Sequence, residues 1–382
     1  MLKTSELERL IIIQQSEKTL EEQNHSMVDW WLRLCNTTPA EHSLINQPCS
    51  YNSTLSVHTW DELQAMVRSK LPYQGGLCID NWEMNLDGYH LYLDKNATEL
   101  IYKICEKEID DDTLIITSVV EHPAVRGAIE SLNRTNIDHV ILNYYNGINE
   151  LNISQVKEAC DKKNYKKAFV MIIGTQVTTG EVTPQKFFTK LKKYLTEKGI
   201  ETVMAIDDCQ GMYLVPRNYN IFDYVIYTAH TLVREHHMGM LWSKKELDFG
   251  LQKEGWLTQY YNKLRVMLKF RNAFNNFSYA MREEFRELYR PYITAVTDSV
   301  PFIFSIKVDC QPSAVFNKYT SDTWLKEYEI KLESDNDKWF YIKMRAAQYI
   351  ATPEKLLKAI PLVKMLLNNV IDYKESINDY NC

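Results

Sequence analysis

Short, almost wholly apolar runs alternate with amphipathic segments through the middle of this 382-residue chain. Runs of this length without a polar face are typical of strands that are covered on both sides. They lie at residues 114–120, 139–142, 168–173, 202–206, 224–228 and 238–242. The segments between them have helical spacing, at residues 124–133, 153–163 and 184–197. A chain with this alternation is expected to form a mainly parallel β-sheet between helices, which is an α/β fold.

The alternation covers only part of the chain, so three regions are expected. Residues 1–84 are expected to form an N-terminal helical segment, and residues 85–250 the large α/β domain. After residue 250 a long polar and aromatic stretch indicates helices, and a strand over Phe302–Val308 follows. A closing helix is expected over Pro353–Val370. Residues 251–382 are therefore expected to form a smaller C-terminal α+β domain.

Composition and charge narrow the classes of function. The net charge is −6, so no basic excess points to nucleic acid or to an anionic membrane surface. No segment approaches the ~20 apolar residues that span a bilayer, and the apolar run near the N-terminus is too short for a signal peptide. The eight cysteines are scattered without a Cys-x-x-Cys pair, which is typical of reduced thiols in a cytoplasmic protein.

The apolar run at 202–206 ends in the sequence Asp207-Asp208-Cys209-Gln210. Open α/β sheets bind their ligands at the carboxyl ends of strands. A carboxylate in this place can pair with a protonated pyridine nitrogen, and the ring then acts as an electron sink. The ordinary alternative is a capping or solvated aspartate.

A second strand end carries Glu121-His122-Pro123-Ala124. Pro123 suits the first turn of a helix. The ring of His122 could stack on a flat heteroaromatic ring. The ordinary alternative is a histidine that caps the helix or packs near its start.

Two further segments offer hydrogen-bond donors for an anion. At Asn96-Ala97-Thr98 a short strand leads through a turn into a helix, whose free N–H groups favour a phosphate. The ordinary alternative here is a helix N-cap. Thr228 and His230 follow a later strand and are candidate phosphate donors as well.

In their order and spacing these segments together resemble the fold-type I family of pyridoxal-phosphate (PLP) enzymes, with features of class V aminotransferases and cysteine desulfurases. The resemblance covers about residues 85–245. The matching segments are Asn96-Ala97-Thr98, Glu121-His122-Pro123-Ala124, Gly180-Glu-Val-Thr-Pro184, Asp207-x-x-Gln210 and Asp223 through His230. The resemblance implies a mainly parallel seven-stranded sheet between helices, with residues 85–250 as the cofactor-binding domain and a smaller C-terminal α+β domain.

The resemblance also implies roles for single residues. Asp207 would pair with the pyridine nitrogen, Gln210 would lie near the ring hydroxyl, and His122 would stack on the ring. The phosphate would be held by Asn96, Ala97, Thr98, Thr228 and His230. For the substrate the match is looser: Arg345 and Lys343 lie where the family binds a carboxylate, and Arg345 suits bidentate capture better.

The main departure from the family is at Thr231, which stands where the family has its Schiff-base lysine. A threonine hydroxyl cannot form an imine and is a poor base near neutral pH. Asn96 also replaces the glycine of the phosphate turn, and Val177 stands where an asparagine often contacts the ring hydroxyl. PLP or its amine form, PMP, is therefore expected to bind non-covalently.

Three further groups of residues could take part in chemistry. Lys244 and Lys245 are candidates for the missing amine, although a Lys-Lys-Glu turn is usually solvated surface. His236 and His237 suggest a metal site only weakly, so no metal is expected. Cys310 follows a strand and is expected to face a core, which argues against a cysteine desulfurase.

Three interpretations of function stay open. The first is a PLP- or PMP-dependent enzyme, with transferase- or lyase-like chemistry on an amino acid or carbonyl substrate, in which His230 moves protons and Thr231 and His122 are the other catalytic candidates. It is similar to the lysine-less, PMP-dependent sugar dehydratases. The second is a non-catalytic pseudoenzyme or regulatory subunit that completes or binds a PLP-enzyme partner, as in heteromeric serine palmitoyltransferase. The third is a fold reused for another ligand.

The first interpretation is preferred because an abandoned pocket has no physical reason to keep a ring-nitrogen acid, a stacking histidine and a phosphate turn together. A homodimer is expected, since fold-type I sites usually form at a dimer interface.

Overall fold

The computed structural model describes residue 61 and most of the chain from 86 to 372. The described segments are 86–134, 137–143, 151–177, 180–212, 215, 217–231, 237–251, 255–261, 285, 287–290, 292–296, 303–308, 312–319, 323–327, 330–335, 339–345 and 361–372. Two compact units divide the chain: one holds residue 61 and the described part of 86–261 other than Gly180, and the other holds the described part of 285–372. The domain divisions expected at residues 84 and 250 stay predictions.

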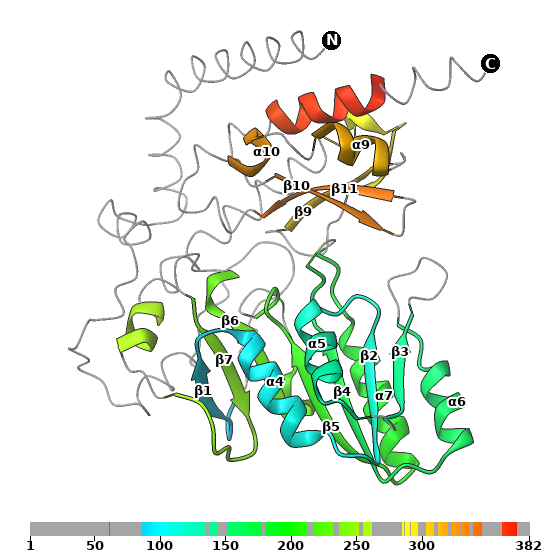
Figure 1. Ribbon diagram of the computed structural model, residues 1–382, viewed down its shortest axis with the longest axis vertical. Helices are drawn as coiled ribbons and strands as arrows, with labels where there is room; N and C mark the ends of the chain where they lie inside the picture. The colour runs from blue at the N-terminus through cyan, green and yellow to red at the C-terminus, as the bar shows by residue number, and fades with distance from the viewer. Residues whose placement is uncertain are drawn as a thin grey trace. The chain divides into compact units, whose positions relative to one another are not determined.

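The first unit is built on a seven-stranded sheet (Figure 1). From one edge to the other its strands are β1 (His90–Asp94), β7 (Gly239–Ser243), β6 (Tyr224–Thr228), β5 (Glu201–Asp207), β4 (Lys167–Ile173), β2 (Thr113–Ser118) and β3 (His139–Leu142). Only β7 is antiparallel to its neighbours in this sheet. The structure therefore confirms the mainly parallel sheet, and each of the six apolar runs forms a strand.

Helices cover both faces of this sheet. They are α4 (Ala97–Glu108), α5 (Pro123–Ser131), α6 (Ser154–Lys162) and α7 (Gln185–Glu197). The connections through α4 and α5 step toward the β3 edge, whereas those through α6 and α7 step back toward β1. Because such crossovers are right-handed, the two pairs of helices lie on opposite faces. The face under α4 and α5 is a buried apolar cluster that includes Ile115, Phe169 and Leu241.

Short helical turns complete the first unit. They are η1 (Tyr219–Ile221) and η2 (Ala229–Thr231), and a further helix covers residues 255–261. The turn η2 directly follows β6, so the residues after this strand leave the sheet in a tight 3₁₀ conformation.

The second unit has a four-stranded antiparallel sheet (Figure 1). Its order is β10 (Ile330–Asp335), β11 (Trp339–Arg345), β9 (Ile303–Val308) and β8 (Ile293–Val296). Its helices include α9 (Pro312–Tyr319), α10 (Thr323–Glu327) and one over residues 361–372, and residues 285 and 287–289 are helical as well. This unit confirms the expected smaller α+β domain.

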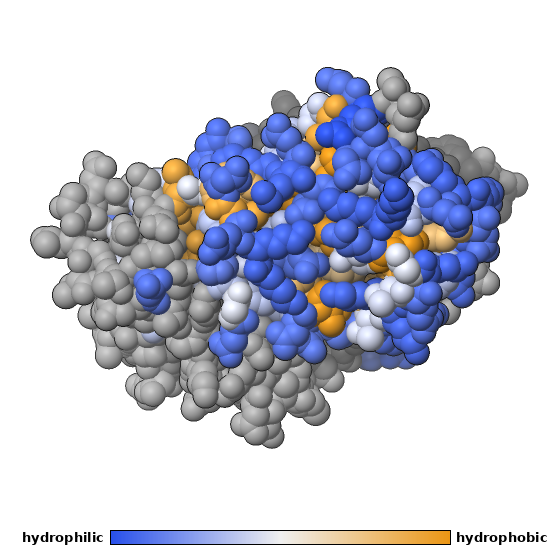
Figure 2. Space-filling model, turned by 90° about the horizontal axis from the view of Figure 1, so that it is seen from below, coloured by the Kyte–Doolittle hydropathy of each residue, from blue (hydrophilic) through white to orange (hydrophobic). Residues whose placement is uncertain are grey.

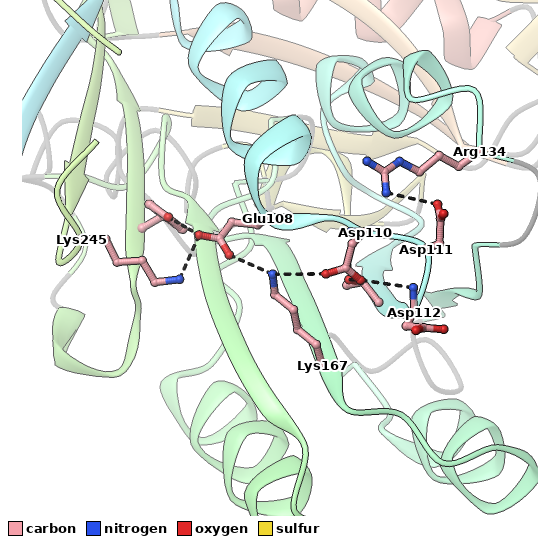
Figure 3. Close-up of polar contacts among 9 residues, drawn as sticks. Glu108, Asp110, Asp111, Asp112, Arg134, Lys167 and Lys245 are labelled. Atoms are coloured by element: carbon pink, nitrogen blue, oxygen red, sulfur yellow. Dashed lines mark hydrogen bonds and ion pairs between the residues drawn. The ribbon is translucent and has the colours of Figure 1, made fainter. Parts of the chain in front are cut away.

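A buried glutamate joins α4 to three other segments at the amino-terminal edge of the parallel strands (Figure 3). Glu108 at the end of α4 is 4% exposed. Its carboxylate accepts a hydrogen bond from the Tyr224 hydroxyl at 2.5 Å and pairs with Lys245 at 2.9 Å and Lys167 at 3.3 Å. Burial opposes ionisation, but the hydroxyl and the two ammonium groups outweigh it and hold the pKa of Glu108 below its usual value. The cluster ties the end of α4 to β4, to β6 and to the turn after β7, at the edge opposite the candidate site.

Hydrophilic residues cover most of the coloured face seen in Figure 2. Within the part of the chain that the structure describes, no helix has the length and apolar character to cross a membrane.

Gly239 begins β7 where this strand passes the N-terminus of α4, and the contact sets a first prediction. A Cβ at this position would lie 2.2 Å from the backbone C and O atoms of Asn96. These atoms cannot give way without moving α4, so we expect Gly239→Ala to lower the free energy of unfolding by roughly 1–3 kcal/mol, the usual cost of overpacking. Urea unfolding measures the change.

The matched control is Gly127→Ala in α5. A Cβ there meets only the end of the Tyr102 side chain, at 2.7 Å, and alanine is favoured over glycine in a helix by about 1 kcal/mol. Equal destabilisation by both substitutions would contradict the close approach at Gly239.

Candidate active site

The strand ends that the sequence pointed to meet at one edge of the large sheet. The register places Gly239 beside Asp94 on one side and Thr228 on the other. Further along the same edge, Asp207 pairs with Ile173. Because neighbouring strands lie about 5 Å apart, the candidate residues form one row that runs from the N-terminus of α4 to that of α5.

The first end of the row is the N-terminus of α4. The Asn96 side-chain oxygen accepts a hydrogen bond from the Glu99 amide at 2.9 Å, so this residue is a helix N-cap, as the ordinary alternative held. The amides of Ala97 and Thr98 belong to the first turn and have no acceptor within the helix. The roles of helix N-cap and of anion site are therefore compatible. The side chain of Asn96 caps α4, and the amides of Ala97 and Thr98 stay available to bind an anion.

The end of β6 adds hydroxyl and imidazole groups beside this turn. The Thr228 hydroxyl lies 2.7 Å from Nδ1 of His230. The Thr231 hydroxyl donates to the Thr228 carbonyl at 2.9 Å. The ring of His230 faces that of His237, with 5.7 Å between the centroids. The hydroxyl proton of Thr231 is thus used in a hydrogen bond to the backbone. The imidazole rings of His230 and His237 lie beside this turn.

Asp207 stands in the middle of the row, at the end of the central strand β5. It is 3% exposed, and its Oδ1 accepts a hydrogen bond from the Cys209 amide at 3.1 Å. Burial raises the pKa of Asp207, and the nearby His122 opposes the rise. A cation bound to this carboxyl would favour the ionised form. Gln210 is buried close by in the chain, at 9% exposure.

Cys209 follows Asp207 and is partly buried. Burial and the adjacent Asp207 raise the pKa of its thiol well above the usual value. The thiol is therefore protonated at neutral pH and is not prepared to act as a nucleophile.

The far end of the row is the turn from β2 into α5. His122 is exposed and caps α5, with Nδ1 accepting a hydrogen bond from the Ala124 amide at 3.2 Å. Glu121 is buried, and its Oε1 accepts from the Ser118 hydroxyl at 2.5 Å and from the Ile173 amide at 3.1 Å. Burial first, and then Asp207, raise the pKa of Glu121 to about 8, so that it is mainly a neutral acid at pH 7.

Beneath the row lies an ion pair that sequence reasoning missed. Asp208 is fully buried; its Oδ2 accepts from the Tyr219 hydroxyl at 2.6 Å and lies 3.4 Å from Nε of Arg217. The Arg217 guanidinium also donates to the carbonyls of Gly174 at 2.6 Å and Thr183 at 3.0 Å. The pair therefore ties the loop after β5 to the loop after β4. An arginine in a loop carries no pattern that would have revealed it.

Lys244 and Lys245 lie at the other end of the sheet. They follow Ser243, which pairs with Tyr224 at the start of β6, and Lys245 is bound to Glu108. The Lys244 ammonium donates to the Asn220 carbonyl. Neither lysine reaches the edge that carries Asp207, so the interpretation that one of them is a displaced site amine is wrong.

The remaining candidates are less constrained. Lys343 and Arg345 lie on β11, but their side chains are outside the described residues, and their role stays a prediction. His236 and Cys310 are also outside the described residues. Among the residues that the structure does describe, no three His, Cys, Asp or Glu side chains form a group that could hold a metal ion.

Comparison with solved structures defines the fold. The chain is similar to a NifS-like protein from Rickettsia africae, with a TM-score of 0.56 and 13% identity over 85% of this chain and 96% of that one. It is also similar to a PLP-bound C-S lyase from Staphylococcus hominis, with a TM-score of 0.54 and 12% identity over 85% and 87% of the two chains. A serine palmitoyltransferase from Sphingomonas wittichii gives a TM-score of 0.55 and 10% identity, over 86% of each chain.

These similarities, with the strand order of the large sheet, show that the chain has the fold-type I architecture of PLP-dependent enzymes. At this level of identity they show the fold alone. A comparison with protein-family models finds no match, and a comparison with curated protein sequences finds none.

The buried pair of Asp208 and Arg217 sets a second prediction. Arg217→Met leaves a buried carboxylate without its cation, so we expect a loss of 3–5 kcal/mol, a typical cost of breaking a buried ion pair. Chemical unfolding measures it. The control is Arg134→Met, which breaks an exposed pair with Asp111 and is expected to cost at most about 1 kcal/mol. Similar losses in the two variants would contradict the role given to Arg217.

Proposed function

We propose that this chain is an enzyme that binds PLP or PMP non-covalently and acts on an amino acid or carbonyl substrate without a tethering lysine. The observation that carries the proposal is Asp207, a buried carboxyl at the end of the central strand, between the donors of α4 and β6 and the ring of His122. The fold-type I architecture supports it, and one of the similar structures is described as PLP-bound.

The middle of the row fits a pyridine ring. Burial, and to a smaller extent the neighbouring Asp208, disfavours the charged form of Asp207, so this carboxyl gains most from a partner that brings a positive charge, such as a protonated ring nitrogen. We assign His122 to one face of that ring, because it lies close enough to Asp207 to favour its ionised form. Gln210, in the same turn, is assigned to the ring hydroxyl.

The α4 end fits a phosphate group. The first-turn amides of Ala97 and Thr98 point along the helix axis, where the helix dipole favours an anion. Thr228 and His230 are brought beside them because Gly239 lets β7 pass close to Asn96. Asn96 takes part through the turn that it caps.

Without a lysine at position 231, proton movement has to come from other groups. A bound cofactor supplies an electron sink through its protonated ring. Asp207 would hold the proton on the ring nitrogen, and His122 would stack on one face of the ring. Thr231 is committed to the Thr228 carbonyl, so proton transfer is assigned to His230. Its Nδ1 faces the Thr228 hydroxyl, and Nε2 is therefore the atom that exchanges the proton.

Three further parts of the proposal rest on the sequence. Arg345 and Lys343 are assigned to a substrate carboxylate. The protein is proposed to be a homodimer, and its location cytoplasmic, as the scattered cysteines favour.

Titration of the purified protein tests the proposal, and this is the third prediction. We expect saturable binding of PMP or PLP, followed by the cofactor's absorbance and by quenching of tryptophan fluorescence. Asp207→Asn removes the charge that pairs with the ring nitrogen and is expected to weaken binding roughly 10- to 100-fold, since a hydrogen bond to a charged group contributes 1.5–3 kcal/mol. An amino-acid panel added to the PLP complex then shows which substrate changes its spectrum.

The matched control is Asp138→Asn, because Asp138 is paired with Lys163 at the surface and its loss should leave the binding constant unchanged. Absence of saturable binding by the wild-type chain contradicts the proposal. It would favour a partner subunit or an unrelated ligand.

A further inference from the structure

Glu121 is a buried acid of the row to which the proposed function gives no role. It lies at the point where β2 leaves the sheet. The pairing of β2 with β4 ends at Ile116 and Val170, whereas β4 continues for three more residues. The Ile173 amide, at the end of β4, is taken by Oε1 of Glu121 at 3.1 Å. The side chain therefore acts as a substitute for the strand that has turned away.

The same carboxyl also closes the turn that leads to His122. The Glu121 amide donates to the Ser118 carbonyl at 3.4 Å, and the Ser118 hydroxyl donates to Oε1 of Glu121 at 2.5 Å. His122 follows directly and caps α5 through the Ala124 amide. The backbone on both sides of His122 is thus fixed by hydrogen bonds, so the position of its ring depends on Glu121.

The second carboxyl oxygen of Glu121, Oε2, indicates that this side chain is a neutral acid. Oε2 is buried, and the structure shows no hydrogen-bond partner for it among the described residues. A charged oxygen in such a place would be costly, while a neutral acid is tolerated. A neutral Glu121 adds no further negative charge beside Asp207, and the neighbouring Asp208 is already paired with Arg217, which suits one ring cation.

We propose that Glu121 is a positioning residue of this site, which as a neutral acid replaces the missing strand partner of Ile173 and thereby holds the His122 ring beside Asp207. The proposal rests on the proposed function, in that the ring held in place is that of a bound pyridine cofactor.

A double-mutant cycle on PMP binding tests whether Glu121 acts through His122. The variants are Glu121→Ala, His122→Asn and the two together; asparagine keeps an N-cap acceptor for α5 but removes the ring. We expect each single variant to weaken binding about tenfold, the size of one good interaction. Since both remove the same ring contact, the double variant should be no more than about threefold weaker than His122→Asn alone.

A conservative variant of Glu121 shows whether this residue positions His122 or only stabilises the fold. Glu121→Gln keeps the shape and the acceptor of a neutral acid, so it is expected to bind PMP within about threefold of wild type. Ser118→Ala removes one of the two groups that hold the carboxyl, and it replaces Glu121→Ala in the cycle if that variant does not fold. The control is Glu130→Gln, an exposed position of α5.

A pH series checks the neutral state without any ligand. The folded-state pKa of about 8 lies above the ordinary 4.5. A proton held more tightly in the folded state stabilises it fully below the ordinary pKa, and this stabilisation is lost as the pH rises through the folded-state pKa. The melting temperature of wild type minus that of Glu121→Gln should therefore fall between about pH 5 and pH 8. The same difference taken with Glu130→Gln should not follow this course.

The outcomes are distinguishable. If wild type binds PMP but the losses of affinity in the two single variants add up, to near a hundredfold in the double variant, the positioning role is overturned. The proposed function is left intact by that result. A melting-temperature difference that does not change with pH overturns the neutral acid. Absence of PMP binding by wild type overturns the proposed function, and the positioning role with it.

Discussion

Four carboxyl groups are buried at one edge of the large sheet, and the structure around that edge depends on how each is compensated. Asp94 pairs with Lys103 at 2.6 Å. Asp208 is balanced by Arg217, whose guanidinium also binds two backbone carbonyls. Glu121 is protonated near neutral pH and serves as a hydrogen-bond acceptor for a strand end. The charge of Asp207 is favoured by hydrogen bonds from the amide and the thiol of Cys209 and by the nearby His122, but these do not outweigh its burial. Asp207 is therefore the acid that a cationic ligand stabilises most.

This division of roles explains why the loops of the edge have their shapes. The loops after β4 and β5 are joined through Arg217, so the backbone around Asp207 is held in place before any ligand binds. The turn after β2 is closed by Glu121. The N-terminus of α4 can lie close to β7 because Gly239 has no side chain. A preorganised edge of this kind lowers the entropy cost of binding a flat, charged ligand.

Much of the fold could be predicted from the sequence, because period and apolar content determine strands and helices directly. The six apolar runs became strands, and the row of Asn96, His122, Asp207 and Thr228 is brought together as the motif order implied. The partnerships of side chains across loops could not be predicted, since they depend on three-dimensional closure. Arg217 and the role of Glu121 are of that kind. The interpretation of Lys244 or Lys245 as the site amine is wrong. Because β7 is antiparallel, it begins at the site edge of the sheet and carries the chain away, so the two lysines that follow it lie at the opposite edge.

We propose that Thr231 stands where a PLP enzyme of this fold carries its lysine. The most direct measurement is to substitute Thr231→Lys, add PLP, reduce with borohydride and map the peptides by mass spectrometry, with Thr231→Met as a variant of similar length without an amine. The account predicts that the cofactor's mass is found on the peptide that carries position 231 in the lysine variant alone. Labelling only of surface lysines, equal in both variants, would contradict it.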